Sequence, residues 1–247
     1  MIPLSEKTRT FADNLMFARR SGATNVVADG PATLAEAMAC QRAVADGLGR
    51  TAAGWKVALM PDWGGVYAPM FSGDVLNGPA RWPLRPGLAV EVELGIELAT
   101  DIASGEWAAD SLEKCVKRAF VGIELVQSRL ELGGQAPFSC HLGDCMANVA
   151  YIAGAATGPW PRFDINTAAC RVTLGDSVLY DALSVHTMGG PMATLQAALR
   201  AGGDAFGGFK AGQIITTGSI CGVLKIPHAG IVTASIAGLG SVSVELA

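Results

Sequence analysis

Three glutamates in the middle of the chain have residue types and spacing suited to binding a metal ion. Glu91 and Glu93 are separated by one residue inside the alternating run 88–99, and Glu124 follows in a second strand-like run that begins at Phe120. Side chains two apart on a strand share one face, roughly 6.6 Å apart, and a neighbouring strand can bring in the third. Carboxylates held together repel one another unless a cation neutralises them, and hard oxygen ligands favour Mg²⁺, Mn²⁺ or Ca²⁺ over zinc. The sequence therefore predicts a divalent-metal site formed by these three side chains.

The same run also fits a simpler structure, a half-buried strand whose acidic face lies in water. Its large apolar residues occupy every second position, which leaves Glu91, Glu93 and Glu97 together on the opposite face. Glu97 would lie about 13 Å beyond Glu93, too far away to share its ion. Glu124 favours the metal site, because its own face carries apolar residues and a buried carboxylate needs a partner or a metal.

The elements that must position these side chains follow from changes in periodicity along the chain. Helical spacing is expected over 4–20, and Thr33 with Glu36 forms a capping box that opens a second helix. Two further helices are expected, one that is capped by Asp110 and runs to about 118, and one over 191–200.

From Ala53 onward the pattern changes to the alternation that is typical of β-strands, with turns marked by Gly and Pro. Besides the two runs that carry the glutamates, strands are expected over 171–174, 212–217 and 231–246. We therefore expect an N-terminal helical cap over 1–52 and one compact, β-rich, metal-binding catalytic body over 53–247.

Composition limits the classes of protein that fit this chain. Of its 247 residues, 50% are hydrophobic and 16% are charged, so a large buried core is available and disorder is not expected. The formal net charge of −4 gives no electrostatic footprint for nucleic acid. No apolar run approaches the roughly 18–20 residues that cross a bilayer, and the first residues lack the apolar segment of a signal peptide. We expect a cytoplasmic protein that binds neither nucleic acid nor membrane.

The six cysteines are scattered through a chain too large to need disulfides, which favours reduced thiols. One cluster, Cys140-His141-x3-Cys145, raises the alternative of zinc. It lacks a fourth ligand at a recognisable spacing, so the carboxylate site is the stronger candidate.

Five motifs in a fixed order resemble those of the fumarylacetoacetate hydrolase superfamily. The similarity spans nearly the whole chain, and its nearest subgroup is that of the 2-keto-4-pentenoate hydratases and 4-oxalocrotonate decarboxylases of aromatic catabolism. The motifs are Gly54-Trp55-Lys56-Val57, Glu91-Val92-Glu93, Glu124-Leu125-Val126-Gln127-Ser128-Arg129, Gly143-Asp144-Cys145-Met146-Ala147 and Lys210-Ala211-Gly212-x4-Thr217-Gly218-Ser219.

The resemblance implies an α+β fold, a mixed β-sheet roll with an N-terminal helical segment. It also implies Mg²⁺ or Mn²⁺ held by Glu91, Glu93 and Glu124, in agreement with the ligand chemistry. The implied partner is a small 2-oxo or 2-hydroxydienoic acid, and a homo-oligomer is expected. A bound ion would act as a Lewis acid that stabilises the enolate of such a substrate.

Candidate roles can be given to further residues of these motifs. Lys56 is the expected acid or electrostatic partner, because apolar neighbours beside a metal would lower its pKa; a solvated surface lysine is the alternative. Asp144 is expected to orient a water or a lysine. Ser219, Asp74 and Arg129 are the substrate-binding candidates, although Ser219 and Asp74 also fit as simple turn residues.

Departures from the subgroup's pattern leave the reaction open. Gln127 stands where the hydratases have aspartate, and Cys145 stands where they have asparagine. Hydration of a 2-hydroxypenta-2,4-dienoate is the leading expectation, with 4-oxalocrotonate-type decarboxylation or acylpyruvate C–C hydrolysis or tautomerisation as rivals. The first histidine is His141, so the N-terminal histidine of related hydrolases has no counterpart. A catalytically silent binding or scaffold relative is the alternative from another class.

Overall fold

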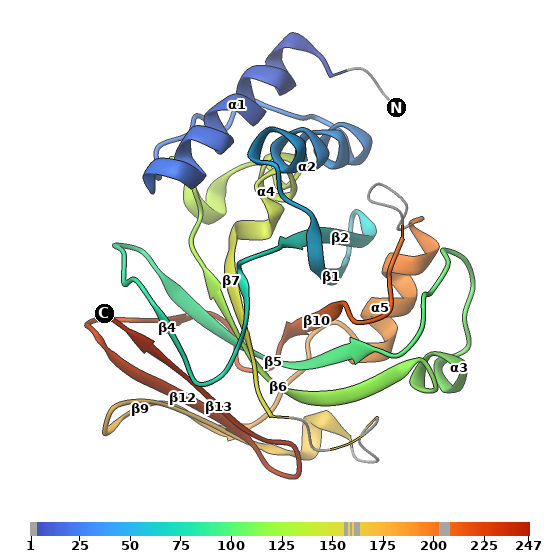
Figure 1. Ribbon diagram of the computed structural model, residues 1–247, viewed down its shortest axis with the longest axis vertical. Coiled ribbons are helices and arrows are strands. Elements are labelled where there is room, and N and C mark those ends of the chain that lie inside the picture. Colours follow the sequence, from blue (N-terminus) through green and yellow to red (C-terminus); the bar gives the residue numbers. More distant parts are fainter. Residues whose placement is uncertain (1–3, 156–157, 159, 161–163, 203–207) are drawn as a thin grey trace.

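Two β-sheets form the centre of the computed structural model, which describes residues 4–155, 158, 160, 164–202 and 208–247 (Figure 1). The larger sheet runs in the order β2–β1–β10–β5–β6–β7–β3, and β11 also pairs with β5. The sheet is mixed, because it contains parallel pairs such as β1–β10 and antiparallel pairs such as β5–β6. Its strands are β1 (Ala52–Met60), β2 (Gly64–Phe71), β3 (Val75–Asn77), β5 (Ala89–Leu98), β6 (Val116–Val126), β7 (Asn148–Ala153), β10 (Ile214–Ser219) and β11 (Leu224–Lys225).

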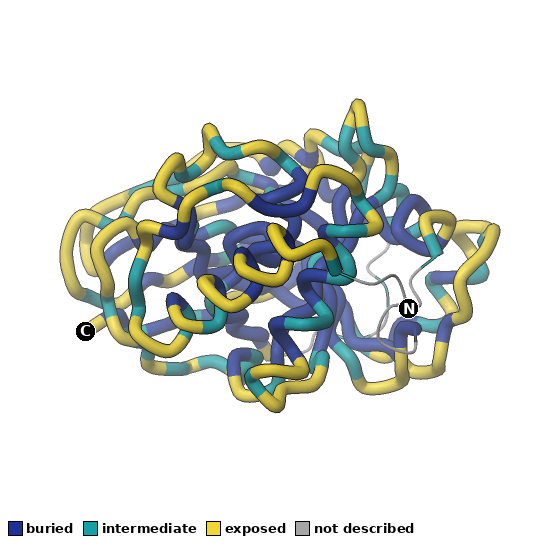
Figure 2. The backbone as a smooth tube through the Cα atoms, turned by 90° about the horizontal axis from the view of Figure 1, so that it is seen from above, coloured by how far each residue is buried: buried dark blue, intermediate teal, exposed yellow. Residues whose placement is uncertain are grey.

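The smaller sheet has the order β4–β13–β12–β8–β9 and packs against the larger one. One apolar core joins the two, because residues of β5 and β6 belong to the same buried cluster as Val232 and Val244. Figure 2 shows the buried segments gathered in the interior, with exposed segments around them. The strands are β4 (Ala80–Trp82), β8 (Ala169–Leu174), β9 (Ser177–Leu183), β12 (Gly230–Ile236) and β13 (Gly240–Leu246).

Helices α1 (Glu6–Ser21) and α2 (Leu34–Leu48) lie together at one end of the molecule (Figure 1). The predicted capping box is confirmed: Thr33 Oγ1 accepts from the Glu36 amide, and the Glu36 carboxylate accepts from the Thr33 amide. Their apolar faces share a buried cluster with β2 and with α4 (Phe138–Gly143). The boundary between a cap over 1–52 and a body over 53–247 stays a prediction, although β1 begins at Ala52.

Helix α5 (Pro191–Arg200) begins and ends as predicted, but the helix expected from Asp110 to about 118 is wrong in its extent. The observed α3 (Ala109–Glu113) has no side-chain cap, and β6 already starts at Val116. Pairing of Val116 with Leu98 of β5 draws this segment into the sheet, where backbone hydrogen bonds replace those of a helix. Element order, mixed sheets and packed helices confirm the α+β fold class.

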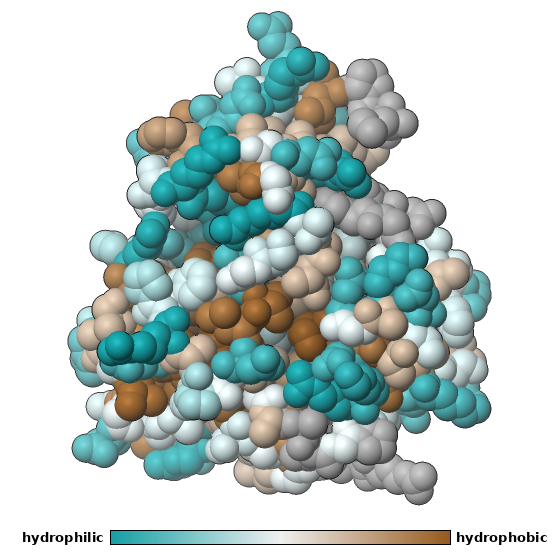
Figure 3. All heavy atoms as spheres, viewed as in Figure 1, coloured by the Kyte–Doolittle hydropathy of each residue, from teal (hydrophilic) through white to brown (hydrophobic). Residues whose placement is uncertain are grey.

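Hydrophilic side chains cover much of the face in Figure 3, and a patch of hydrophobic side chains crosses its middle. Apolar atoms contribute more than half of an ordinary protein surface, so this patch by itself identifies no partner. Within the described residues, no helix combines the length and the apolar character that a membrane span requires.

Candidate metal and active site

The pairing of β5 with β6 brings the three predicted carboxylates to one place. Glu91 lies directly opposite Glu124 in the antiparallel register, and Glu93 follows on the same face of β5. One ligand atom from each of the three lies within 4.8 Å of the others. Glu93 and Glu124 are 0% exposed, and Glu91 is partly exposed. The acidic face of β5 is therefore not a solvated surface.

Glu97, on the same strand, has other partners. Its carboxylate pairs with Lys117 and Arg118, 2.6 and 2.5 Å away. This arrangement agrees with the expectation that Glu97 lies too far along the strand to join the other three.

Lys56 reaches the carboxylates from β1. Its Nζ lies 2.9 Å from Glu124 Oε2 and 3.1 Å from Glu91 Oε2, and it donates to the Met146 carbonyl at 3.4 Å. Burial lowers the pKa of Lys56, but Glu124, Glu91 and Glu93 together outweigh it and leave the pKa raised. The lowering of this pKa was expected for a lysine beside a bound metal and stays a prediction; without the ion, three carboxylates stabilise the ammonium.

Neighbouring groups hold the carboxylates in fixed orientations. Asn148 donates from Nδ2 to Glu124 Oε1 at 2.9 Å, and the Gly218 amide donates to Glu93 Oε2 at 3.3 Å. Glu93 Oε1 is buried without a hydrogen-bond donor among the described residues. Burial raises the pKa of Glu93, and repulsion from Glu124 and Glu91 raises it further. The pKa of Glu124 is also raised, mainly by burial.

This donor set fits a hard divalent cation. It offers only carboxylate oxygens, one of them buried with no donor among the described residues, and its negative charge exceeds what the single lysine neutralises. The predicted zinc alternative has no such support, because the only cluster with metal-ligand geometry among the described residues is the glutamate triad. Cys140 Sγ instead contacts the carbonyls of Ala28 and Pro31.

A cavity of about 280 Å³ opens beside Lys56 and Glu91. Its size is at the lower end of the range for small-molecule sites. The wall combines these two charged groups with a histidine, neutral polar groups and apolar side chains. The lining residues are Lys56, Gly87, Ala89, Glu91, Val126, Gln127, Ser128, Gly134, His141, Met146, Ala147 and Val223.

One wall of this cavity is a left-handed turn built from three residues that are not glycine. Cys145, Met146 and Ala147 have φ values of 55°, 52° and 60°. Such a conformation costs each L-residue about 1–2 kcal/mol, so the surrounding packing must hold it. The turn places the Met146 carbonyl against Lys56, and the Ala147 carbonyl accepts from the Gln127 amide at 2.9 Å.

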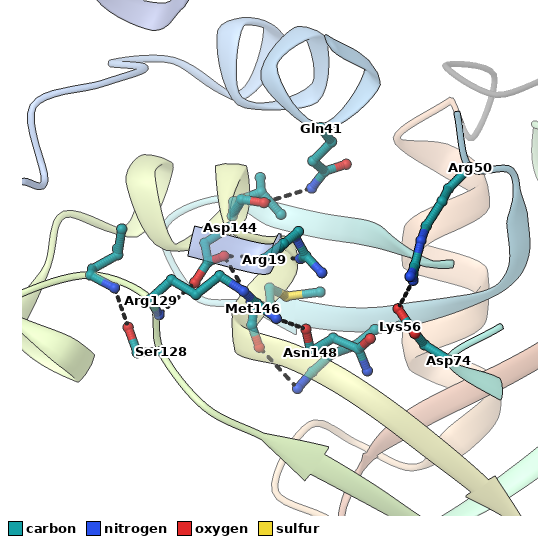
Figure 4. A network of polar contacts seen from close by, with 12 residues as sticks. Arg19, Gln41, Arg50, Lys56, Asp74, Ser128, Arg129, Asp144, Met146 and Asn148 are labelled. Atoms are coloured by element: carbon teal, nitrogen blue, oxygen red, sulfur yellow. Dashed lines mark hydrogen bonds and ion pairs between the residues drawn. The ribbon is translucent and has the colours of Figure 1, made fainter. Parts of the chain in front are cut away.

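Asp144 and Arg129, which face each other in Figure 4, are not among the residues that line this cavity. Asp144 is 0% exposed; it accepts from the Arg129 amide at 3.0 Å and from Arg129 Nη1 at 2.9 Å. Arg129 also donates from Nη2 to the Asn148 carbonyl at 2.9 Å, and Asn148 holds Glu124. The pair is thus connected to Glu124 through Asn148.

Asp74 and Ser219 do not line the cavity either. Asp74 accepts from Arg50 at 2.5 Å in a different cavity. Ser219 pairs with Glu93 in the sheet register, but its hydroxyl donates to the Gly222 carbonyl at 3.0 Å. Ser219 therefore matches the turn-residue alternative in this structure.

Two residues near the site were not among the catalytic or substrate-binding candidates of the sequence analysis. Asn148 donates to Glu124, and His141 lines the cavity. Burial lowers the pKa of His141, and the positive charge of Lys56 lowers it further. Asn148 directly follows the motif 143–147 in the sequence. This position could have marked Asn148 as a candidate for the site.

Comparison with known proteins gives both relatives and solved structures, although no protein-family model matches the chain. It is 27% identical over 188 residues to a protein named 2-keto-4-pentenoate hydratase from Paraburkholderia phymatum, covering 74% of this chain and 68% of that protein. Its fold is similar to that of 4-oxalocrotonate decarboxylase from Pseudomonas putida G7, complexed with magnesium and adipate; the TM-score is 0.85 at 16% identity, with 100% of both chains covered.

Fumarylpyruvate hydrolase from Pseudomonas aeruginosa, in complex with Mn²⁺ and pyruvate, is similar at a TM-score of 0.54 and 14% identity, over 80% of this chain and 88% of that one. The order of the motifs, the named relative and the full-length fold similarity agree with one another. The chain is therefore similar in sequence to proteins named 2-keto-4-pentenoate hydratase, and it shares its fold with 4-oxalocrotonate decarboxylase.

Proposed function

We propose that the chain is a lyase that depends on a divalent metal and adds water to a 2-hydroxypenta-2,4-dienoate or a similar 2-oxo acid. The observation that carries this proposal is the convergence of Glu91, Glu93 and Glu124 with Lys56 beside one cavity. The hydratase relative supports the choice of reaction. In hydration the substrate and one water form a 4-hydroxy-2-oxo acid, and no carbon is lost.

The three glutamates would hold Mg²⁺ or Mn²⁺, the ions named for the similar decarboxylase and fumarylpyruvate hydrolase structures. A divalent ion supplies a Lewis acid for the oxygens of a 2-oxo acid and stabilises negative charge that develops on them. Asn148 and Gly218 keep two of the carboxylates oriented, which limits the reorganisation needed when the site is loaded.

Lys56 is the proposed proton donor or electrostatic partner. Its ammonium lies on the cavity wall, and the carboxylates keep it protonated in the metal-free protein. A cation that neutralises those carboxylates would weaken this stabilisation and bring the pKa of Lys56 down toward a range useful for proton transfer. The lysine can then give a proton to a carbon of the dienoate, or stabilise the negative charge of its enolate form.

Asp144 and Arg129 act as positioning residues in this proposal. They fix Asn148 through its carbonyl, and Asn148 in turn fixes Glu124. We assign neither of them a direct contact with the substrate, because neither lines the cavity beside Lys56. Asp74 and Ser219 would contact a substrate only if it extended past the cavity beside Lys56, and we keep them as substrate-binding candidates for that case.

Decarboxylation of a 4-oxalocrotonate-type acid is the second candidate, because the full-length fold similarity is to such a decarboxylase. The same carboxylates and lysine could serve either reaction. Acylpyruvate hydrolysis has less support, because no histidine precedes His141 to activate water with a carboxylate. A third candidate is a binding protein without catalytic activity, because Gln127 and Cys145 replace residues of the hydratase pattern. The three clustered carboxylates argue against it, since buried charges without a function would be costly.

Incubation with Mg²⁺ and a small panel of acids, followed by product identification, tests the proposal. The panel contains 2-hydroxydienoates, acylpyruvates and oxaloacetate. We expect a 4-hydroxy-2-oxo acid from 2-hydroxypenta-2,4-dienoate. Release of CO₂ would identify a decarboxylase, whereas cleavage to pyruvate and a carboxylic acid would identify a hydrolase. Binding of Mg²⁺ and oxalate without any turnover would support the silent relative.

A cytoplasmic location and a homo-oligomeric state are further parts of this proposal. The six cysteines are free, as expected for thiols in a reducing compartment. Light scattering at several protein concentrations would test for the oligomer.

A further inference from the structure

A second cavity, of about 330 Å³, lies where the carboxyl end of α1 approaches the segment that follows β4. It is lined by five arginines, Arg19, Arg20, Arg50, Arg85 and Arg129, whereas Asp74 is the only carboxylate among its lining residues. The chain as a whole has a net charge of −4, so this concentration of positive charge is local to the cavity.

The arginines differ in how many of their guanidinium N–H groups have hydrogen-bond or ion-pair partners in the protein. Arg129 is paired with Asp144, Arg50 is paired with Asp74, and Arg20 donates to the Gly47 carbonyl. For the guanidinium of Arg85 the structure records no hydrogen bond or ion pair with the described residues; its backbone carbonyl accepts from the Leu88 amide at 3.1 Å. Its guanidinium packs against Gly22, which ends α1 at a φ of 81° and where a Cβ would collide with Nη1. The cavity wall is thus shaped so that this guanidinium fits.

Arg19 has a buried and only weakly paired guanidinium. Its side chain is only 8% exposed, and its Nε and Nη2 have no hydrogen-bond acceptor among the described residues. The nearest carboxylate oxygen, of Asp144, is 3.9 Å away and is already engaged by Arg129. Phe71 lies 5.0 Å beneath the guanidinium, and Cys145 offers only a thiol. Burial lowers the pKa of Arg19, and the positive charge of Arg129 lowers it further.

A buried guanidinium without acceptors is costly, and an anion that offers several oxygens would remove that cost. Guanidinium groups match carboxylate and phosphate oxygens in a two-bonded geometry, so a cluster of arginines in a cavity favours these anions over halides. From this geometry we propose that the cavity is a binding site for a small oxyanion, a carboxylate or phosphate group held by Arg19 and Arg85.

This site is separate from the cavity beside Lys56, because Gln127 is the only residue that lines both. The side chain of Gln127 is neutral and donates to the Pro86 carbonyl at 2.6 Å, so it adds no negative charge to the shared wall. A structural link joins the two sites as well. Arg129 lines the anion cavity and donates to the Asn148 carbonyl (Figure 4). The side chain of Asn148 in turn donates to Glu124.

Calorimetric titration of the full chain tests the proposal, with inorganic phosphate in one arm and succinate in the other. Both arms use buffer without added divalent metal and with constant ionic strength set by sodium chloride. We expect saturable binding of at least one anion. Arg85→Gln and Arg19→Gln should each weaken it about tenfold or more, as expected for a lost charge-assisted hydrogen bond. Arg171→Gln removes an exposed arginine on β8 that pairs with Asp181, and it should leave the affinity unchanged.

Equal loss of affinity in Arg171→Gln and Arg85→Gln would mean that only overall charge is sensed, and it would overturn the proposal. So would an absence of saturable binding in both arms. Arg85 is exposed, so its variant gives a result even if Arg19→Gln fails to fold. A parallel Mg²⁺ titration keeps this inference apart from the proposed reaction: Mg²⁺ binding without anion binding removes the oxyanion site alone, and the reverse outcome removes the metal site alone.

Discussion

Lys56 Nζ lies 2.9 Å from Glu124 Oε2, and this contact provides an internal counter-ion for the carboxylate triad. Glu91 Oε2 is 3.1 Å from the same nitrogen. One ammonium therefore pairs with carboxylates from two adjacent strands, β5 and β6. A single ammonium cannot balance three clustered carboxylates. The remaining negative charge provides an electrostatic attraction for a divalent cation, and the lysine is held where a substrate bound beside that cation would meet it.

The first prediction concerns Glu124. Glu124→Gln keeps the size of the side chain and a carbonyl for Asn148 but removes one charged ligand. We expect Mg²⁺ at about 100 times its Kd to raise the Tm of the unsubstituted protein by roughly 5–10 °C. In Glu124→Gln most of this increase should be lost, as measured by thermal unfolding with and without Mg²⁺.

Glu97→Gln is the matched control for this experiment. Glu97 lies on β5 like Glu91 and Glu93 but pairs with Lys117 and Arg118. The substitution should lower the Tm without changing the increase caused by Mg²⁺. An equal Mg²⁺ effect in Glu124→Gln and the unsubstituted protein would show that the ion binds elsewhere.

Lys56 is the subject of the second prediction. Lys56→Ala should lower kcat by roughly 10²–10⁴, as for other positioned acids and bases, while binding of the 2-oxo acid largely persists. Lys56→Arg should not restore the rate, because guanidinium stays protonated and cannot exchange a proton at working pH. Steady-state kinetics with Mg²⁺ would separate the effects on kcat and KM.

Lys210→Ala serves as the control, because Lys210 is exposed and pairs with Asp101 outside the site. Its kcat should stay within roughly twofold of the parent value, the range expected of surface substitutions. Full activity in Lys56→Ala would remove the lysine from the mechanism and leave the metal site untouched.

Local sequence patterns were sufficient to predict that the three glutamates lie together, but not to predict which residues surround them. The i, i+2 spacing of Glu91 and Glu93 fixes their common face, and pairing with the next strand brings in Glu124. The same alternation of apolar and acidic residues was also compatible with a strand whose acidic face is exposed to water. Glu93 is buried because groups distant in sequence, such as Lys56 and the Gly218 amide, gather over this face in the folded protein.

Asp144 and Asn148 show why residue roles were harder to predict than residue types. Asp144 was expected to act on a water or a lysine, but Arg129 takes both of its oxygens in the folded protein. Asn148 contacts Glu124 because β7 pairs with β6, and a shift in that register between Leu125 and Val126 sets the alignment. No local sequence pattern encodes such a shift. The residues that hold the carboxylates in place could therefore be identified only from the structure.

The third prediction is that thiols are not part of the chemistry. Cys140 and Cys145 are buried, and burial raises the pKa of each thiol, so neither is a ready nucleophile. Cys140→Ser and Cys145→Ser should retain metal-dependent activity within roughly tenfold, whereas loss of a carboxylate ligand should cost far more. Inactivation by thiol reagents combined with indifference to chelators would reverse this assignment.

The last prediction concerns the pH dependence of stability and His186, which is 5% exposed. Its Nδ1 accepts from the Gly190 amide at 3.0 Å, and its Nε2 faces the Thr217 carbonyl at 2.9 Å, a pattern that only the neutral ring with a proton on Nε2 satisfies. Burial lowers the pKa of His186 below its ordinary value.

Between the lowered pKa of His186 and about 6.5, the unfolded chain binds more protons at this residue than the folded protein does, so stability should fall as pH decreases through that window. His186→Asn keeps an acceptor for Gly190 but cannot titrate, so it should be less stable at pH ~7.5 and lose less stability on acidification. His228→Asn, at an exposed histidine, should keep the parent's dependence. Urea unfolding at several pH values would measure the difference between parent and variant, in which groups common to both cancel. Parallel pH profiles for the parent and His186→Asn would show that His186 is not the titrating group.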